Sequence, residues 1–359
     1  MLINKNKLIN NQFEEHIQLM VKVLESNIQG INSIILYGGY GRGEGVWIES
    51  NGSYNPYNDY DILVVLADGV NKPKNISVIK KNLLNKINIE WIDLSCIHLK
   101  SFLRDKRKTI FRYDLIHGSK VIFGDSDLLK KIQNIDSSEI LINEGKLLFF
   151  TRLWPFIGGI KILKDLDASE ALFFRYQMSK VVLASVDMIL LMRGSYVSSY
   201  IERCKIAVEI CKKENLLGKE MIDWAIKQKL RPSNEIMSKG EVIVMQEKIA
   251  IIFSNYSLRL LSKVYKKNFS NLIEFKKFYC NSFFEKFKIF AGFALRKKIN
   301  YNKIHPLNIV QLIILYHILG EISLDYTINE CNKLLQKLGF SSITDLDSLK
   351  ELVASERLN

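Results

Sequence analysis

Along the first 125 residues, short apolar runs alternate with stretches whose apolar residues recur at helical spacing. The runs predict strands, and the helical spacing predicts helices between them. The predicted strands lie at residues 33–37, 61–66, within 87–97 (centred on 91–94) and at 120–123, and the predicted helices at 13–27, 75–86 and 99–117. This alternation is typical of an α/β domain.

After about residue 140 the apolar pattern is almost entirely helical. Pro155 is expected to end or kink the first helix of this part. The predicted helices cover residues 147–154, 168–192, 199–215, 219–229, 241–265, 270–293 and 306–322. The expected fold class is α/β plus all-α, with an α/β domain over residues 1–140 and a larger helical domain over residues 141–359.

The segment with the strongest chemical signal covers residues 33–66. Its first predicted strand ends in Gly38 and Gly39, and a glycine-rich loop that contains Arg42 follows. Glycines at a strand end let the backbone approach a ligand closely and expose amide N–H groups to phosphate oxygens. A guanidinium can contact two phosphate oxygens at once. Gly38, Gly39 and Arg42 are therefore the predicted phosphate-binding residues.

Two carboxylates open the second predicted strand. Asp59 and Asp61 are two residues apart, and residues i and i+2 of a strand point to the same face. Mg²⁺ prefers carboxylate oxygens together with substrate phosphates. A two-metal site needs a further carboxylate, for which Asp93, between apolar neighbours on the next strand, is the first choice. Glu90 is the alternative, because alternation lets only one of these two face the site.

In this order, the motifs resemble the DNA-polymerase-β-like nucleotidyltransferase superfamily. Its signature is a Gly-Ser or Gly-Gly turn, a downstream Asp-x-Asp or Asp-x-Glu, and a later single acid on a strand. Gly38-Gly39, then Asp59 and Asp61, then Asp93 match these elements. The resemblance covers roughly residues 30–125 and implies a small mixed sheet with flanking helices. It also implies transfer of a nucleoside monophosphate from a nucleoside triphosphate such as ATP, with release of pyrophosphate and with two Mg²⁺ ions in the site.

The resemblance assigns roles to the matching residues. Asp59, Asp61 and Asp93 would be the catalytic and metal-binding residues, with Asp93 nearer the acceptor and able to take the proton of its hydroxyl. Gly38, Gly39 and Arg42 would hold the β- and γ-phosphates. Residues 46–57 lengthen the usual interval before Asp59, and we expect them to form a surface loop.

Lys180 is a further candidate nucleotide-binding residue. It lies in the predicted helix 168–192. Its setting resembles that of a lysine which, in many nucleotidyltransferases with a helical second domain, reaches the triphosphate. The alternative is an ordinary lysine whose stem lies along an apolar helix.

The net charge of +13 is unevenly spread. Residues 251–300 contain 11 basic and 2 acidic side chains, whereas residues 1–150 contain 19 and 17. A basic segment attracts polyanions, so RNA is a candidate partner through residues 251–300. The alternative is a solvated lysine-rich face, since the chain is rich in Ile, Lys and Asn and lysine is its default surface residue.

Several classes of protein are not expected. The five cysteines form no C-x-x-C pair, which argues against a zinc ribbon or a disulfide scaffold. The N-terminal residues show no apolar run typical of a secretory signal. The apolar run at residues 309–319 is shorter than the ~20 residues that span a bilayer. We therefore expect a cytoplasmic protein without a membrane span.

The leading functional prediction is a Mg²⁺-dependent nucleotidyltransferase acting on a hydroxyl of a small acceptor, such as a sugar or an aminoglycoside-like molecule. One alternative keeps the chemistry and changes the acceptor to RNA, for example a tRNA end, or to a protein hydroxyl. Another alternative is a catalytically silent nucleotide-binding scaffold.

Overall fold

The computed structural model describes residues 7–50, 53–89, 91–158, 164–214, 219–281, 301–321, 323–336, 339–349 and 351–352. The chain forms two compact units. The first unit contains Met1–Leu141 together with two later segments, Arg193–Ile206 and Lys229–Arg231. The second unit contains Ile142–Met192, Ala207–Gln228 and Pro232–Asn359. Two segments that the sequence pattern groups with the helical part thus belong to the first unit.

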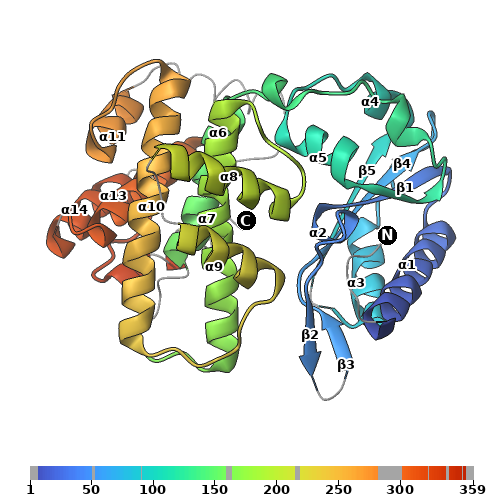
Figure 1. The fold of residues 1–359 in the computed structure, drawn as a ribbon, viewed down its shortest axis with the longest axis horizontal. Coiled ribbons are helices and arrows are strands. Elements are labelled where there is room, and N and C mark those ends of the chain that lie inside the picture. The colour runs from blue at the N-terminus through green and yellow to red at the C-terminus, as the bar shows by residue number, and fades with distance from the viewer. Residues whose placement is uncertain are drawn as a thin grey trace. The chain divides into compact units, whose positions relative to one another are not determined.

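A four-stranded sheet of order β5-β4-β1-β6 forms the centre of the first unit (Figure 1). Strands β4 and β5 are parallel, whereas β1 is antiparallel to both of its neighbours. The strands are β1 (Ile31–Tyr37), β4 (Tyr60–Leu66), β5 (Ile92–His98) and β6 (Lys120–Gly124). The predicted fold class, a small mixed sheet with a helical domain after it, is confirmed.

Helices cover both faces of this sheet. The helices of the first 141 residues are α1 (Lys7–Asn27), α2 (Gly38–Gly41), α3 (Ile76–Ile87), α4 (Leu99–Arg104), α5 (Ile110–Gly118) and the 3₁₀ turns η1 (Leu128–Lys131) and η2 (Ser137–Glu139). Alternate strand residues pack against α1 and α3 on one face and against α4, α5 and η1 on the other. We call the second of these the α4/α5 face.

Residues 46–57, expected to form a surface loop, instead contain a two-stranded hairpin. Strands β2 (Trp47–Ser50) and β3 (Ser53–Pro56) pair antiparallel. The ring of Trp47 lies against His16 of α1, with ring centroids 5.9 Å apart. The inserted stretch is therefore anchored to the core of the first unit.

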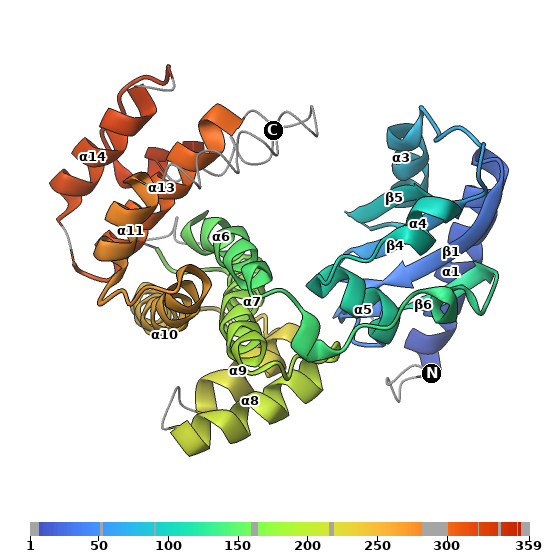
Figure 2. The same cartoon turned by 90° about the horizontal axis from the view of Figure 1, so that it is seen from above.

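The remaining helices that the structure describes belong wholly or mainly to the second unit. They are α6 (Asn143–Gly158), α7 (Ala168–Arg193), α8 (Tyr200–Glu214), α9 (Lys219–Leu230), α10 (Lys239–Tyr265), α11 (Leu272–Asn281), α13 (Tyr301–Ile318) and α14 (Leu324–Gln336). Helix α7 runs beside α6 and α10 in both views (Figures 1 and 2). Its residues from Val181 to Leu191 are all buried, so this part of the helix is covered on all sides.

Two helices differ from their prediction. Helix α6 continues past Pro155 to Gly158, so of the two expected effects of this proline, an end or a kink, the helix does not end there. The helix predicted over residues 99–117 is broken at residues 105–109 into α4 and α5. There the Asp105 and Thr109 side chains accept hydrogen bonds from backbone N–H groups of Arg107 and Arg112, which competes with helical bonding.

Much of the predicted helix 270–293 lies outside the described residues, beyond the end of α11. Within the part of the chain that the structure describes, no helix combines the length and apolar character needed to cross a membrane.

Candidate functional site

Two of the predicted carboxylates meet at one end of the sheet. Asp61 on β4 is in register with Asp93 on the parallel strand β5 and with Tyr37 on the antiparallel strand β1. Neighbouring strands lie about 4.8 Å apart, so these three side chains start from adjacent backbone positions. The Tyr37 hydroxyl donates a hydrogen bond to Oδ2 of Asp93 at 3.3 Å.

Strand alternation sets which way the two acids point. Tyr60 and Ile62 are fully buried in the core beside α1 and α3. Asp61, between them, therefore lies on the α4/α5 face of the sheet. Asp93 is exposed between buried Ile92 and Leu94 in the same way. The alternative acid, residue 90, lies outside the described residues.

The first glycine of the turn is in direct contact with Asp61. Gly38 has φ +65°, a conformation that favours glycine. A Cβ atom on Gly38 would lie 1.8 Å from Oδ2 of Asp61, so only glycine leaves room for this carboxylate. Gly39 is buried, and a Cβ there would lie 3.0 Å from Nδ2 of Asn58, the residue before Asp59. The Gly-Gly turn and the acids thus form one compact structure.

The carboxylates influence one another electrostatically. Burial, and after it the negative charges of Asp59 and Asp93, raises the pKa of Asp61 to about 7. Arg42 and Lys229 act against this shift. Burial and the nearby charges of Asp93 and Asp61 also raise the pKa of Tyr37, which keeps its hydroxyl protonated as a hydrogen-bond donor. The site is therefore rich in negative charge that its cations offset only in part.

The donor set suits a hard divalent cation. Asp59, Asp61 and Asp93 offer carboxylate oxygens, and the repulsion felt at Asp61 is what a bound cation would relieve. Among the residues that the structure describes, no group of three or more His, Cys, Asp or Glu side chains is already arranged as a ligand set. Mg²⁺ in nucleotide sites is commonly held by one or two carboxylates plus phosphates and water. The residues present fit such an ion.

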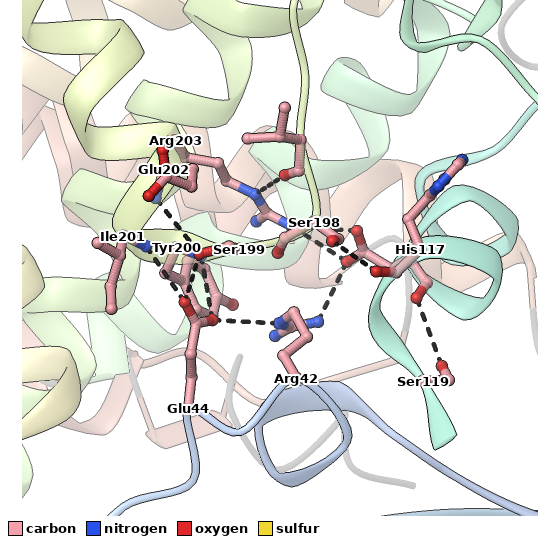
Figure 3. Close-up of polar contacts among 12 residues, drawn as sticks. Arg42, Glu44, His117, Ser119, Ser198, Ser199, Tyr200, Ile201, Glu202 and Arg203 are labelled. Carbon is pink, nitrogen blue, oxygen red and sulfur yellow. Dashed lines mark hydrogen bonds and ion pairs between the residues drawn. The ribbon is translucent and has the colours of Figure 1, made fainter. Parts of the chain in front are cut away.

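Glu44, at the end of the glycine-rich turn, binds the start of α8. Its buried carboxylate accepts hydrogen bonds from Ser199 Oγ (2.7 Å) and from the backbone N–H groups of Tyr200 (3.0 Å) and Ile201 (3.2 Å) (Figure 3). The first N–H groups of a helix have no acceptor within the helix, so Glu44 supplies one. A residue 155 positions earlier in the sequence thus caps this helix.

The side chain of Arg42, which is predicted to bind phosphate, is buried and forms contacts with other residues of the protein. Its side chain is only 7% exposed, with Nε 3.3 Å from Glu44 and Nη1 3.4 Å from Asp114 of α5. The guanidinium also lies over the Tyr200 ring, 4.9 Å from its centroid. Glu44, Asp114 and the Tyr200 ring thus all contact the guanidinium of Arg42, whose bond to Glu44 is drawn in Figure 3.

Asp114 joins α5 to the segment before α8. It accepts hydrogen bonds from Nη2 of Arg203 (3.1 Å) and from the hydroxyl of buried Tyr196 (3.2 Å). Arg203 is itself buried, and it also donates to the backbone carbonyls of Val197 and Ser198. This charged cluster fixes residues 193–206 as part of the first unit.

Lys229 is a site residue that the sequence pattern does not reveal. Its side chain is buried, with Nζ 5.5 Å from the centroid of the Tyr200 ring, and its charge acts on Asp61. The sequence shows only a lysine near the end of a helix, three residues before Pro232. Lys180, the predicted nucleotide-binding lysine, lies on α7 in the second unit, where Nζ is 4.4 Å from the centroid of the Tyr176 ring.

The described part of the basic region 251–300 forms a surface pocket in the second unit. The pocket has a volume of about 440 Å³ at the C-terminal end of α10. The described residues that line it include four cations and no acid: Leu258, Arg259, Ser262, Lys263, Lys266, Lys267, Asn268 and Phe269. Residues 282–300 lie outside the described part of the chain.

No protein-family model matches the chain, and none of the curated proteins is similar to it. A solved structure described as a toxin–antitoxin with AMP-PNP is 21% identical over 32% of this chain and 77% of its own, with a TM-score of 0.22. The functional proposal therefore rests on the residues of the site and their geometry.

Proposed function

We propose that the first unit is a Mg²⁺-dependent nucleotidyltransferase, which transfers a nucleoside monophosphate from a nucleoside triphosphate to a hydroxyl group. The supporting observation is the register of Asp61 with Asp93, with Gly38 packed against the Asp61 carboxylate. Paired carboxylates beside a glycine turn suit a metal-bound triphosphate.

The acids would act at the two ends of the transferred group. Asp59 and Asp61 would hold Mg²⁺ next to the triphosphate, and Asp93 would lie on the acceptor side. Bound Mg²⁺ would neutralise charge on the phosphate oxygens. The acceptor oxygen bonds to the α-phosphorus, its proton passes to the Asp93 carboxylate, and the bond from the α-phosphorus to pyrophosphate breaks.

The triphosphate would contact the turn and a nearby cation. The backbone of Gly38 and Gly39 would approach the phosphates closely, since neither residue has a side chain in the way. Lys229, whose charge reaches Asp61, is the lysine of the first unit that we assign to the phosphates. Arg42 would instead keep the turn in place through Glu44 and Asp114.

Transfer of label tests this proposal. Purified protein is incubated with Mg²⁺, each α-³²P-labelled nucleoside triphosphate, and a host extract separated into small-molecule, RNA and protein fractions. We expect label in one fraction, and a rate about 10³-fold lower for Asp61→Asn and for Asp93→Asn, because each loses a charge that positions the reacting groups. The fraction that carries the label gives the acceptor class.

Asp68→Asn is the matched control. Asp68 is an exposed acid just beyond the other end of β4, where its Oδ1 accepts from the backbone N–H of Lys100 at 3.0 Å. This variant should transfer label at the rate of the unmodified protein. Transfer that persists in Asp61→Asn, or triphosphate binding without transfer to any fraction, would exclude the proposed reaction; the second result would favour a silent scaffold.

A further inference from the structure

A strongly basic segment connects α4 to α5. Residues 104–112 contain five basic side chains and one acid, Asp105. Both flanking helices pack on the sheet face that carries Asp61 and Asp93. Four of the five basic side chains are exposed: Arg104, Lys106, Arg107 and Lys108.

The ion pairs that these basic side chains form do not explain why the segment carries so many of them. Arg107 pairs with Asp105 at 2.7 Å and is still 65% exposed, and Lys108 pairs with Glu139 at 2.5 Å. Exposed ion pairs of this kind contribute little to folding. With two acids against five cations, the segment keeps a clear positive excess that an anionic ligand could use.

The fifth cation of the segment, Arg112, is only partly satisfied by the described residues, although the charge of Asp105 acts on it. Arg112 is only 3% exposed, and its backbone N–H bonds to Thr109 at the start of α5. Its Nε and Nη2 atoms have no hydrogen-bond partner among the described residues. Buried donors without acceptors cost free energy, so this guanidinium is suited to receive an anion.

Two exposed aromatic rings lie near the acceptor-side acid. Phe111 is 48% exposed, and its ring centroid is 5.5 Å from that of Tyr37, whose hydroxyl bonds to Asp93. Trp91, two residues before Asp93, is 68% exposed. Cations interleaved with exposed aromatic rings are the means by which proteins bind single-stranded nucleic acid, through phosphate contacts and base stacking.

We propose that residues 104–112, with Trp91, bind the end of a single-stranded RNA and present its terminal hydroxyl to Asp93. This inference rests on the proposed function and names its acceptor. The exposed cations would contact phosphates, and Phe111 would stack on a base. A cationic aminoglycoside would be repelled by this segment, and a neutral sugar would leave its charges unused. The ribose end supplies two vicinal hydroxyls, either of which can attack.

Binding is measured by fluorescence anisotropy with a short single-stranded RNA labelled at its 5′ end, between about 50 and 200 mM salt. Removing two phosphate contacts in Lys106→Ala/Arg107→Ala should lower the slope of log K against log salt by about 1.4, since each contact to a single strand contributes about 0.7. Phe111→Ala should weaken binding by about 5- to 100-fold without changing this slope, because stacking is lost and charge is not.

Lys81→Ala/Lys86→Ala is the matched control, with the same change of charge on exposed residues of α3, which packs on the other sheet face. It should bind RNA like the unmodified protein. The inference would be overturned if both double variants lost RNA binding equally, or if neither lost it. Stronger binding of DNA of the same sequence would also overturn it.

A second readout separates this inference from the proposed function. With Mg²⁺ and α-³²P-labelled triphosphate, we expect the same RNA to gain label, and to gain less in Phe111→Ala. Label in the small-molecule or protein fraction would overturn the RNA acceptor and leave the transferase in place. RNA bound through this segment with no transfer to any fraction would overturn both the acceptor role and the proposed reaction.

Discussion

At Gly38 the absence of a side chain decides where the Asp61 carboxylate can lie. The glycine has φ +65°, and Oδ2 of Asp61 occupies the space where a Cβ would be. Two constraints therefore act on one residue, the backbone conformation and the close approach of a carboxylate. A glycine elsewhere in the same unit, Gly69, has the first constraint without the second: its φ is +84°, with no atom within 4 Å of a Cβ.

The pair Gly38→Ala and Gly69→Ala separates these effects. In both variants the unfolding free energy should fall by about 1–2 kcal/mol, because alanine is strained in the left-handed conformation. Gly38→Ala must also displace the Asp61 carboxylate, so we expect it alone to abolish label transfer. Urea unfolding and the transfer assay together measure this. If Gly69→Ala lost transfer to the same extent, the contact with Asp61 would not be the cause.

His16 makes stability depend on pH. Its Nδ1 lies 3.1 Å from the buried Tyr60 hydroxyl, and burial lowers the pKa of His16 below its ordinary value of 6.5, against the opposing charge of Glu15. Below pH 6.5 the unfolded chain binds a proton that the folded protein does not, so the free energy of unfolding falls as the pH falls.

His16→Gln should remove this part of the pH dependence. Between pH 7 and pH 5 we expect its unfolding free energy to change less steeply than that of the unmodified protein, by up to about 1.4 kcal/mol per pH unit. Urea titrations at several pH values measure both slopes. Parallel slopes would show that His16 is protonated equally in the folded and unfolded chains.

At the scale of elements, the glycine-rich turn and α8 stabilise each other. Glu44 accepts bonds from the first N–H groups of α8, and Arg42 joins the turn to Asp114 of α5. Glu44 and Asp114 each accept hydrogen bonds from groups in a distant part of the chain. The geometry of the glycine-rich turn therefore depends on residues far from it in the sequence.

Glu44→Ala should lower the unfolding free energy by about 3–5 kcal/mol, because it leaves the buried Arg42 charge and the α8 N–H groups short of an acceptor. Glu49→Ala is the control: Glu49 is exposed on β2, 3.3 Å from the Tyr54 hydroxyl, and its loss should cost no more than about 0.5 kcal/mol. Urea unfolding monitored by circular dichroism compares the two. Similar values for both would show that the Glu44 bonds add little.

At the scale of the whole molecule, the chain crosses between its two units more than once. Arg193–Ile206 and Lys229–Arg231 return to the first unit and bring Ser199, Arg203 and Lys229 to it. Each unit has its own group of basic side chains. In the first unit they lie at residues 104–112, and in the second they line the pocket at the end of α10. Part of the net charge of +13 thus lies in two described groups of basic side chains, one in each unit.

The sequence by itself determined most of the helices and strands and the order in which the motifs follow one another along the chain. Short apolar runs placed Asp61 and Asp93 on predicted strands, and glycines marked the turn, because these signals are local. It did not reveal the break at residues 105–109, which depends on side-chain bonds of Asp105 and Thr109.

Only the tertiary structure decided what the buried charges do. Arg42 seemed free to bind phosphate in the sequence, but its guanidinium lies between Glu44 and Asp114. Lys229 carries no motif, yet its charge acts on Asp61. Asp114 lies 72 positions from Arg42, and Ile201 lies 157 positions from Glu44, and no local pattern encodes contacts over such distances.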